Sequence, residues 1–122
     1  MNVEGITWHV IVLDPEPFAA TKVLLTETFG LAPAMEAEGM VRFIMPNGTM
    51  LDLRAPQAVP DYGFNDGLVF GFRVDDLEAA SAALEEAGCE LLGEITPVEE
   101  MAYVYRDFRG PDGRVYGLSE HK

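Results

Sequence analysis

The chain contains one short phrase twice, once near its middle and once near its end. Residues 46–53 read Pro-Asn-Gly-Thr-Met-Leu-Asp-Leu, and residues 111–118 read Pro-Asp-Gly-Arg-Val-Tyr-Gly-Leu. Each copy holds an Asn-Gly or Asp-Gly pair, a dipeptide that adopts positive φ easily and favours tight hairpins. Each then continues into a short strand that ends in leucine. A repeat over this distance predicts two copies of one supersecondary unit.

A strand and a helix precede each copy of the phrase. Alternating and helical apolar spacing predicts a strand at residues 6–13 followed by a helix at about 18–29, and a strand at 68–74 followed by a helix from 77 to about 87. Further short strands are predicted at residues 35–36, 40–45, 49–54, 90–94, 102–108 and 114–119. Each half therefore reads strand, helix, strand, strand, strand, which is a βαβββ module of the α+β class.

The two helices have recognisable ends and apolar faces. Asp75 or Asp76 can cap the second helix, and Gly88 can end it. The apolar face of that helix is expected to hold Leu77, Ala80, Leu84 and Ala87. The first helix is expected to end at Gly30. One face of this helix is expected to hold Phe18, Lys22, Leu25 and Phe29.

A length of 122 residues fits one domain, since domains usually need roughly 100–200 residues. Module one spans about residues 5–55, module two spans about 68–120, and a linker that contains proline and glycine joins them at about 56–67. A module of this size is marginal for a core of its own. We therefore expect a single domain over residues 1–122, in which the modules share a core or pair across a dimer.

The charge balance limits the partners. Eight basic and 21 acidic side chains give a net charge of −13, whereas phosphate-binding surfaces are densely basic. This balance disfavours nucleic acid and anionic membranes. A single cysteine excludes a disulfide scaffold, and no apolar run is long enough to span a membrane. The start of the chain lacks the pattern of a secretory signal. We expect a cytoplasmic protein with a small-molecule ligand.

The paired modules resemble the vicinal oxygen chelate superfamily, which includes glyoxalase I, extradiol dioxygenases and bleomycin-resistance proteins. The resemblance covers nearly the whole chain. It is most specific in the second half, in the stretches GLVFGFRVDDLEAASAALEEAG and FRGPDGRVYGLSE. It implies two modules that curl into an open, cup-shaped mixed β-sheet barrel with helices packed outside. It also implies a homodimer.

The resemblance implies a metal site, because enzymes of this superfamily bind a divalent metal in the cup through His, Glu, His and Glu. These ligands come from the first and last strands of each module. Here the last strand of module one carries Asp52 at the corresponding place. Module two has Val69 and Gly117 at its two places, and neither side chain can bind a metal.

The fourth position is open to two interpretations. Counting back from Gly30 by the usual family spacing leads to Val10, and His9 lies one residue away. Successive side chains of a strand point to opposite faces, so a shift of one residue decides on which face His9 lies. An extra residue within 14–17 would turn His9 into the cup; without it, His9 faces the helix.

A reduced ligand set favours a function without metal. His9 and Asp52 alone fall short of the roughly three protein ligands common in catalytic metal sites. We therefore predict no metal cofactor and a protein that binds or sequesters a small molecule such as a drug or natural product, closest to the bleomycin-resistance branch. The alternative is a lyase, isomerase or dioxygenase that uses Zn, Ni, Mn or Fe with a reduced ligand set. A third possibility is an accessory subunit whose cup is filled by its own side chains.

Strand alternation predicts which side chains line the cup. Asp52 could meet a cationic or hydroxyl-bearing ligand, and Arg73 could meet a carboxylate. The competing interpretation is that Asp52 pairs with Arg73 or Arg54, because a buried charge needs a partner. Aromatic side chains could stack on a flat ligand or simply fill the core. The candidate ligand-binding residues are Trp8, Asp52, Arg54, Arg73, Tyr103 and Tyr105; no catalytic residue is assigned. On the opposite face, Phe70, Phe72 and Val74 are expected to pack under the helices.

Overall fold

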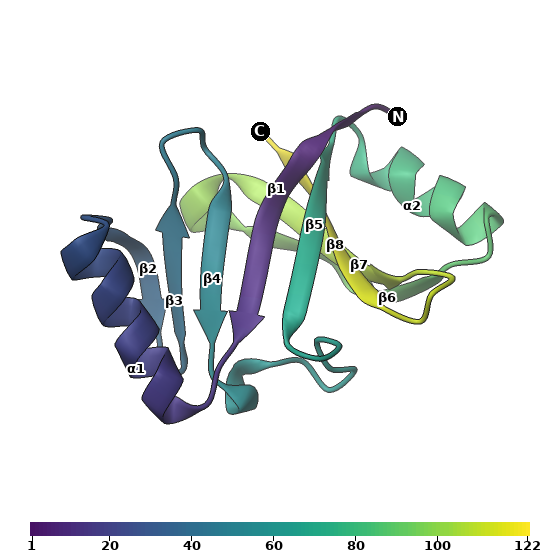
Figure 1. The fold of residues 1–122 in the computed structure, drawn as a ribbon. Coiled ribbons are helices and arrows are strands. Elements are labelled where there is room, and N and C mark those ends of the chain that lie inside the picture. Colours follow the sequence, from purple (N-terminus) through teal and green to yellow (C-terminus); the bar gives the residue numbers. More distant parts are fainter. The chain divides into compact units, whose positions relative to one another are not determined.

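The computed structural model describes all 122 residues and divides them into two compact units. One unit is Trp8–Val69, and the other combines Met1–Thr7 with Phe70–Lys122. The beginning of the first strand therefore belongs with module two. The element order confirms the α+β class and both βαβββ modules (Figure 1).

The elements lie close to the predicted positions. Module one consists of β1 (Val3–Val12), α1 (Pro15–Val23), β2 (Pro33–Ala37), β3 (Met40–Ile44) and β4 (Met50–Arg54). Module two consists of β5 (Leu68–Val74), α2 (Leu77–Glu86), β6 (Glu90–Val98), β7 (Tyr103–Arg109) and β8 (Val115–His121). Single helical turns lie at Leu24–Thr28, Pro56–Ala58 and Glu99–Met101.

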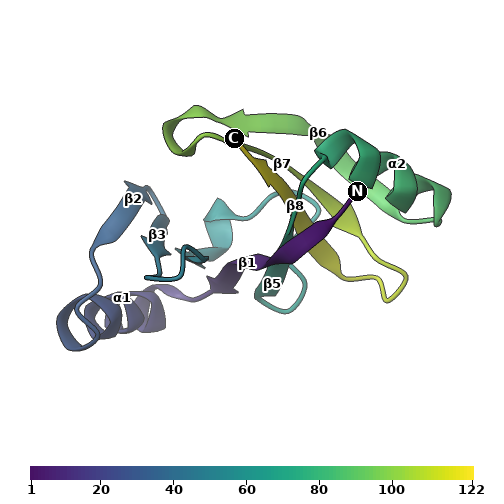
Figure 2. The ribbon, with the colours of Figure 1, turned by 90° about the horizontal axis from the view of Figure 1, so that it is seen from above.

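The Trp8–Val69 unit places four strands in the order β2-β3-β4-β1. Strand β1 runs parallel to β4, and the other neighbours are antiparallel. Helix α1 and the turn after it lie on one side of these strands (Figures 1 and 2). Beneath them is an apolar cluster whose buried members are Leu25, Val41, Phe43 and Leu53.

The first helix differs from its prediction at both ends. It begins at Pro15, three residues earlier than expected, because proline is well tolerated in a first helical turn where its missing N–H is not needed. Its last turn, Leu24–Thr28, is a π-helical turn that shifts the following residues around the axis. Phe29 is consequently 65% exposed and does not belong to the buried face.

The other unit places its strands in the order β5-β8-β7-β6, with β5 parallel to β8. Helix α2 covers a cluster whose buried members are Val74, Leu77, Ala80, Phe108 and Leu118. Asp76, rather than Asp75, caps this helix by accepting a hydrogen bond from the Ala79 N–H. Ala87 is the C-cap residue and is exposed, so the predicted apolar face ends before it.

The two copies of the repeated phrase fold alike. The backbone N–H groups of Met45 and Gly110 donate to the carbonyls of Thr49 and Arg114, which closes a three-residue loop in each case. The third loop residue has a φ of 87° at Gly48 and 80° at Gly113, a conformation that favours glycine. The sequence repeat is therefore a repeat of hairpin geometry.

Strand β5 confirms part of the predicted alternation. Val74 is buried under α2 and Phe72 packs against the same cluster. Phe70 was expected to join them, but it is 47% exposed, because the α2 cluster reaches only the last part of the strand.

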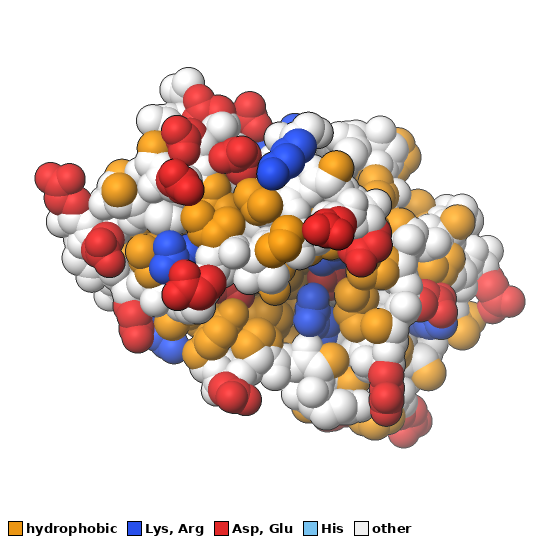
Figure 3. Space-filling model, turned by 180° about the vertical axis from the view of Figure 1, so that it is seen from behind, with side chains coloured by type: hydrophobic (Ala, Val, Ile, Leu, Met, Phe, Trp, Pro, Cys, Tyr) orange, Lys and Arg blue, Asp and Glu red, His pale blue; other side chains and the backbone are white.

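Acidic side chains are spread over the face shown in Figure 3, between patches of hydrophobic side chains and a few basic ones. This distribution agrees with the net charge of −13. Neither α1 nor α2 has the length and apolar character that a membrane-spanning helix requires.

Candidate functional site

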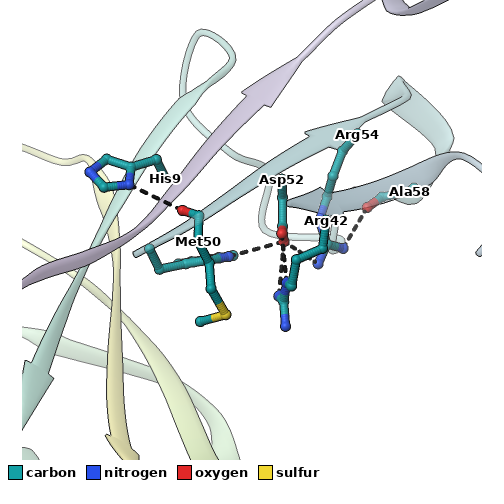
Figure 4. Close-up of polar contacts among 7 residues, drawn as sticks. His9, Arg42, Met50, Asp52, Arg54 and Ala58 are labelled. Atoms are coloured by element: carbon teal, nitrogen blue, oxygen red, sulfur yellow. Dashed lines mark hydrogen bonds and ion pairs between the residues drawn. The ribbon is translucent and has the colours of Figure 1, made fainter. Parts of the chain in front are cut away.

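Asp52 is fully buried in the Trp8–Val69 unit and accepts hydrogen bonds from three side chains. Arg42 donates from Nε to Oδ1 over 2.6 Å and from Nη2 to Oδ2 over 2.9 Å. Arg54 donates from Nη2 to Oδ2 over 3.3 Å, and the Trp8 indole donates to Oδ2 over 3.0 Å. Figure 4 shows both guanidinium groups converging on the carboxylate. The acidic group is thus shared by two arginines.

Strand register brings these residues together. The hairpin between β3 and β4 turns around Asn47, so Arg42 and Asp52, which are equally distant from Asn47 in the chain, face one another. The parallel pairing of β1 with β4 places Val10 beside Asp52 and Trp8 beside Met50. Alternate residues of a strand share a face, so Trp8 lies on the face that carries Asp52.

The two arginines around Asp52 differ in their exposure. Both guanidinium groups form ion pairs with the Asp52 carboxylate, and the side chain of Arg42 is only 5% exposed. Arg54 is the more accessible partner, with 22% of its side chain exposed. Its Nη1 donates to the Ala58 carbonyl over 3.1 Å, whereas its Nε is buried and has no hydrogen-bond acceptor.

Aromatic rings lie beside the arginines. The guanidinium carbon of Arg54 is 5.8 Å from the centroid of the buried Phe64 ring. Phe64 in turn makes edge contacts with Trp8 at 5.9 Å and with Tyr62 at 6.5 Å. The linker that contains Tyr62 and Phe64 therefore provides one apolar wall of the cluster.

His9 lies on the other face of β1. It is offset by one residue from Trp8 and shares its parity with Ile11, which packs in the cluster under α1. Its Nδ1 lies 3.1 Å from the Met50 carbonyl, and Figure 4 shows the ring beside that carbonyl and away from the Asp52 carboxylate. Of the two interpretations of this position, the structure places His9 on the helix side.

The remaining predicted site residues lie in the other unit. Arg73 Nε is 3.0 Å from Glu4 Oε1 in an exposed ion pair, so Arg73 does not pair with Asp52. Tyr103 is buried and stacks on His121, with ring centroids 4.9 Å apart. Tyr105 is half-buried and tilted against Tyr103. The structure thus brings together Trp8, Asp52 and Arg54 of the predicted set.

Arg42 is the residue that the sequence analysis missed. It stands alone as a charge in the apolar run Met-Val-Arg-Phe-Ile of β3. Once Asn47–Gly48 is recognised as the hairpin turn, the register predicts that Arg42 faces Asp52. The signal was therefore present in the spacing, but it required pairing the two strands rather than considering each one alone.

The donor set of the cluster does not fit a divalent metal. The carboxylate of Asp52 already accepts four hydrogen bonds, and a metal bound there would lie beside two guanidinium groups of the same charge sign. Trp8, Val10 and Val12, the β1 residues of this unit that share the face of Asp52, have no side-chain atom that serves as a metal ligand.

Comparisons with known proteins agree with the fold. A family model described as "Glyoxalase/Bleomycin resistance protein/Dioxygenase superfamily" matches residues 9–115. No curated protein sequence matches the chain.

Solved structures match over nearly the whole chain at low identity. The Mn(II)-bound glyoxalase from Novosphingobium aromaticivorans has a TM-score of 0.73 at 21% identity over 97% of this chain, which spans only 39% of that protein. The methylmalonyl-CoA epimerase from Mycobacterium tuberculosis has a TM-score of 0.69 at 18% identity, covering 98% of this chain and 89% of that one. A superfamily member from Vibrio splendidus 12B01 has a TM-score of 0.62 at 14% identity, covering 98% and 99%. Identities this low establish the fold and not the activity.

Proposed function

Because the chain belongs to the glyoxalase/bleomycin resistance protein/dioxygenase superfamily, we propose that it binds a small molecule and does so without a catalytic metal. The observation that carries this proposal is the environment of Asp52. A carboxylate that could have served as a metal ligand is instead held by Arg42 and Arg54. Binding in this unit then depends on protein groups alone.

The energetics of the cluster support the same function. A buried ion pair is a weak source of stability, because desolvation of both partners offsets their attraction. Here a second arginine, Arg54, brings a further charged group to the same buried carboxylate. Arrangements of this kind, with charged groups beside aromatic walls, are typical of ligand sites and contribute little to an efficient core.

A metal-dependent lyase, isomerase or dioxygenase is the second candidate. It is favoured by the names of structural neighbours, which include a Mn(II)-bound glyoxalase and methylmalonyl-CoA epimerases. The hydrogen-bond donors around Asp52 argue against this candidate. A metal-dependent enzyme would have to take its metal ligands from the rest of the chain. The two candidates differ in whether binding requires a divalent ion.

Thermal shift separates the candidates. The purified protein is screened against a small-molecule library twice, once after treatment with EDTA and once with Mn²⁺, Zn²⁺, Ni²⁺ or Fe²⁺ added. A ligand at 100 times its Kd stabilises the fold by about 2.7 kcal/mol, which is readily detected. The proposal expects the same hits in both screens. Hits that appear only with metal support the enzyme, and no hits in either screen indicate that the protein's own side chains fill the site.

We further propose that the chain acts as a homodimeric, single-domain protein in the cytoplasm. Sedimentation equilibrium of the purified chain tests the dimer directly, because the expected mass is twice 13.4 kDa.

A further inference from the structure

The loop that joins β3 to β4 contains the dipeptide Asn47–Gly48, which has no part in the proposed function. Figure 1 shows this loop at the tip of the hairpin, and both residues are exposed. We propose that Asn47 is a site of spontaneous deamidation assisted by Thr49. We also propose that the fold accepts the aspartate product, because the second loop already has Asp112 at the equivalent place. The reaction requires no ligand, so the proposal is independent of the proposed function.

Deamidation at an Asn-Gly pair needs only the chain and water. The backbone nitrogen of Gly48 attacks the side-chain Cγ of Asn47 and gives up its proton to water. The bond from Cγ to Nδ2 then breaks, and ammonia leaves after taking a proton from water, which closes a succinimide ring. Water adds to either ring carbonyl and opens the ring, which produces aspartate or isoaspartate. No oxidant or reductant takes part, so access of water is what the site requires.

The residue that follows distinguishes Asn47 from the other two asparagines of the chain. Gly48 has no side chain to shield its nitrogen. Apart from its chain neighbours, no atom lies within 4 Å of the place that a Cβ would take there. Asn2 and Asn65 are followed by valine and aspartate, whose side chains hinder the attack. Asn47 should therefore be the reactive asparagine.

The side-chain amide of Asn47 is held by Thr49. Its Oδ1 accepts a hydrogen bond from the Thr49 N–H over 3.1 Å and another from the Thr49 hydroxyl over 2.8 Å. Negative charge develops on this oxygen while the nitrogen of Gly48 adds to Cγ, and donors that are already aimed at such an oxygen stabilise it. The two hydrogen bonds therefore favour the first step of the reaction.

One hydrogen bond of the turn opposes the reaction. The Gly48 N–H donates to the Met45 carbonyl over 2.8 Å, and this bond must open before the nitrogen can attack. Exposed loops open locally at a much lower free energy than the whole fold. We therefore expect the folded protein to deamidate more slowly than the unfolded chain, through local opening of the loop and without global unfolding.

The second copy of the repeated phrase shows how an aspartate fits in this loop. Oδ1 of Asp112 accepts a hydrogen bond from the Arg114 N–H over 3.0 Å, which is the counterpart of the backbone bond that Asn47 accepts. The Gly113 N–H donates to the Gly110 carbonyl over 3.0 Å, as the glycine of the first loop donates within its own turn. An aspartate in place of Asn47 would keep these hydrogen bonds.

The isoaspartate product should behave differently. It routes the main chain through the side-chain carbon and so lengthens the loop by one methylene. The hairpin turns around Asn47, and this turn pairs Arg42 with Asp52. A longer loop disturbs that pairing, so the isoaspartyl form should unfold at a lower urea concentration than the aspartyl form.

Peptide mapping tests the proposal. The purified, folded chain is incubated at neutral and at mildly alkaline pH in water enriched in oxygen-18, which labels each carboxyl group that forms, and is then digested in ordinary water. Mass spectrometry measures the labelled fraction of the Asn47 peptide, with the peptides of Asn2 and Asn65 as internal controls. A second sample in concentrated urea gives the rate for the unfolded chain. The proposal expects label at Asn47 in the folded sample, faster labelling at alkaline pH and in urea, and little or no label at the other two asparagines.

Variants assign the effect to the loop. Asn47→Gln keeps an amide but must close a larger ring, so the label should be lost. Thr49→Val removes the hydroxyl donor with little change of shape and should slow labelling about threefold or more, as expected for the loss of an ordinary hydrogen bond. The matched control is Thr96→Val, which removes a hydroxyl that donates to the Glu94 carbonyl in the other unit and should leave the rate unchanged. Asn47→Asp, which is the product itself, should unfold at the same urea concentration as the wild-type protein.

Each part of the proposal can fail separately. Absence of label at Asn47 in the folded sample overturns the deamidation site, whether or not the urea sample reacts, and so does equal labelling of Asn65. Wild-type labelling of Thr49→Val overturns the assistance by Thr49. A clearly lower unfolding midpoint for Asn47→Asp overturns the acceptance of the product. None of these results affects the proposed function, which the thermal-shift screen tests on its own.

Discussion

Arg42 and Asp52 face one another across the β3–β4 hairpin, and the Nε of Arg42 lies 2.6 Å from Oδ1 of Asp52. Both side chains are buried, and a second arginine and an indole N–H complete the shell of the carboxylate. The pair therefore links the stability of the Trp8–Val69 unit to the site that we propose as the ligand-binding site.

Replacing Asp52 with Asn should strongly destabilise the protein. The substitution keeps the volume but leaves two guanidinium groups facing a neutral amide, and breaking a buried ion pair costs about 3–5 kcal/mol. Urea unfolding followed by circular dichroism measures the change. Asp61→Asn, in the exposed part of the linker, is the control and should change stability by less than about 0.5 kcal/mol. A loss below about 1 kcal/mol for Asp52→Asn would show that the cluster is not electrostatically coupled.

The indole N–H of Trp8 should contribute measurably to the stability of the fold through its hydrogen bond to Asp52. Trp8→Phe keeps an aromatic ring against Phe64 but removes a donor to a charged acceptor, which is worth about 1.5–3 kcal/mol. Because the smaller ring also loses packing, a double-mutant cycle with Asp52→Asn isolates the hydrogen bond. A coupling energy near zero would contradict the geometry.

Two acidic side chains should stabilise the start of α2. Asp76 accepts from the Ala79 N–H, and Glu120 of β8 accepts from the Leu77 N–H over 2.8 Å. Asp76→Ala should cost about 1 kcal/mol in the free energy of unfolding, as is usual for an N-cap. Glu86→Gln at the other end of the helix is the comparison, and it should be neutral or slightly stabilising because a negative charge is unfavourable there. Equal losses for the two variants would rule out the capping role.

Asp112 and Tyr116 should titrate as a linked pair. The Tyr116 hydroxyl donates to Asp112 over 2.6 Å, which lowers the pKa of the carboxyl and raises the pKa of the phenol. The contribution of the carboxyl to stability is present above its ordinary pKa of 3.8 and is lost as the pH falls through the lowered value. The contribution of the phenol is present below its ordinary pKa of 10.0 and is lost as the pH rises through the raised value.

Carbon-13 NMR titration of the aspartate carboxyls tests this pair. Tyr116→Phe should move the pKa of Asp112 upward toward its ordinary value. The pKa of Asp75, which is lowered chiefly by the backbone N–H of Asn2, provides the internal control and should stay where it is. If the pKa of Asp112 were the same in Tyr116→Phe as in the wild-type protein, the hydrogen bond between the two side chains would be contradicted.

The two βαβββ modules could be predicted from the sequence because the residues that determine their turns, caps and helices are close together in the chain. The repeated Pro-Asn-Gly and Pro-Asp-Gly turns, the cap at Asp76 and the apolar spacing of α2 each determine a short piece of structure on their own. The end of α1 was not predictable in the same way. Its π turn rotates Phe29 out of the buried face, and no residue in that stretch is a recognised signal for such a turn.

The site was predictable only in part, since it depends on pairing between strands. Asp52 and Arg54 were identified from one strand, and their pairing was among the alternatives considered. Arg42 required the register of the hairpin, and the face of His9 required the register of β1 against β4. The arrangement of the two units as a cup stays a prediction.

The central claim is that the Asp52 carboxylate belongs to the arginine pair and not to a metal ion. The most direct test is the metal content of the purified, untagged protein after exposure to Zn²⁺, Ni²⁺, Mn²⁺ or Fe²⁺ and removal of free ions, measured by plasma mass spectrometry. Our account predicts well under one ion per chain, with no difference between the wild-type protein and folded His9→Ala and Asp52→Asn variants. Near-stoichiometric metal in the wild-type protein that disappears in both variants would contradict it.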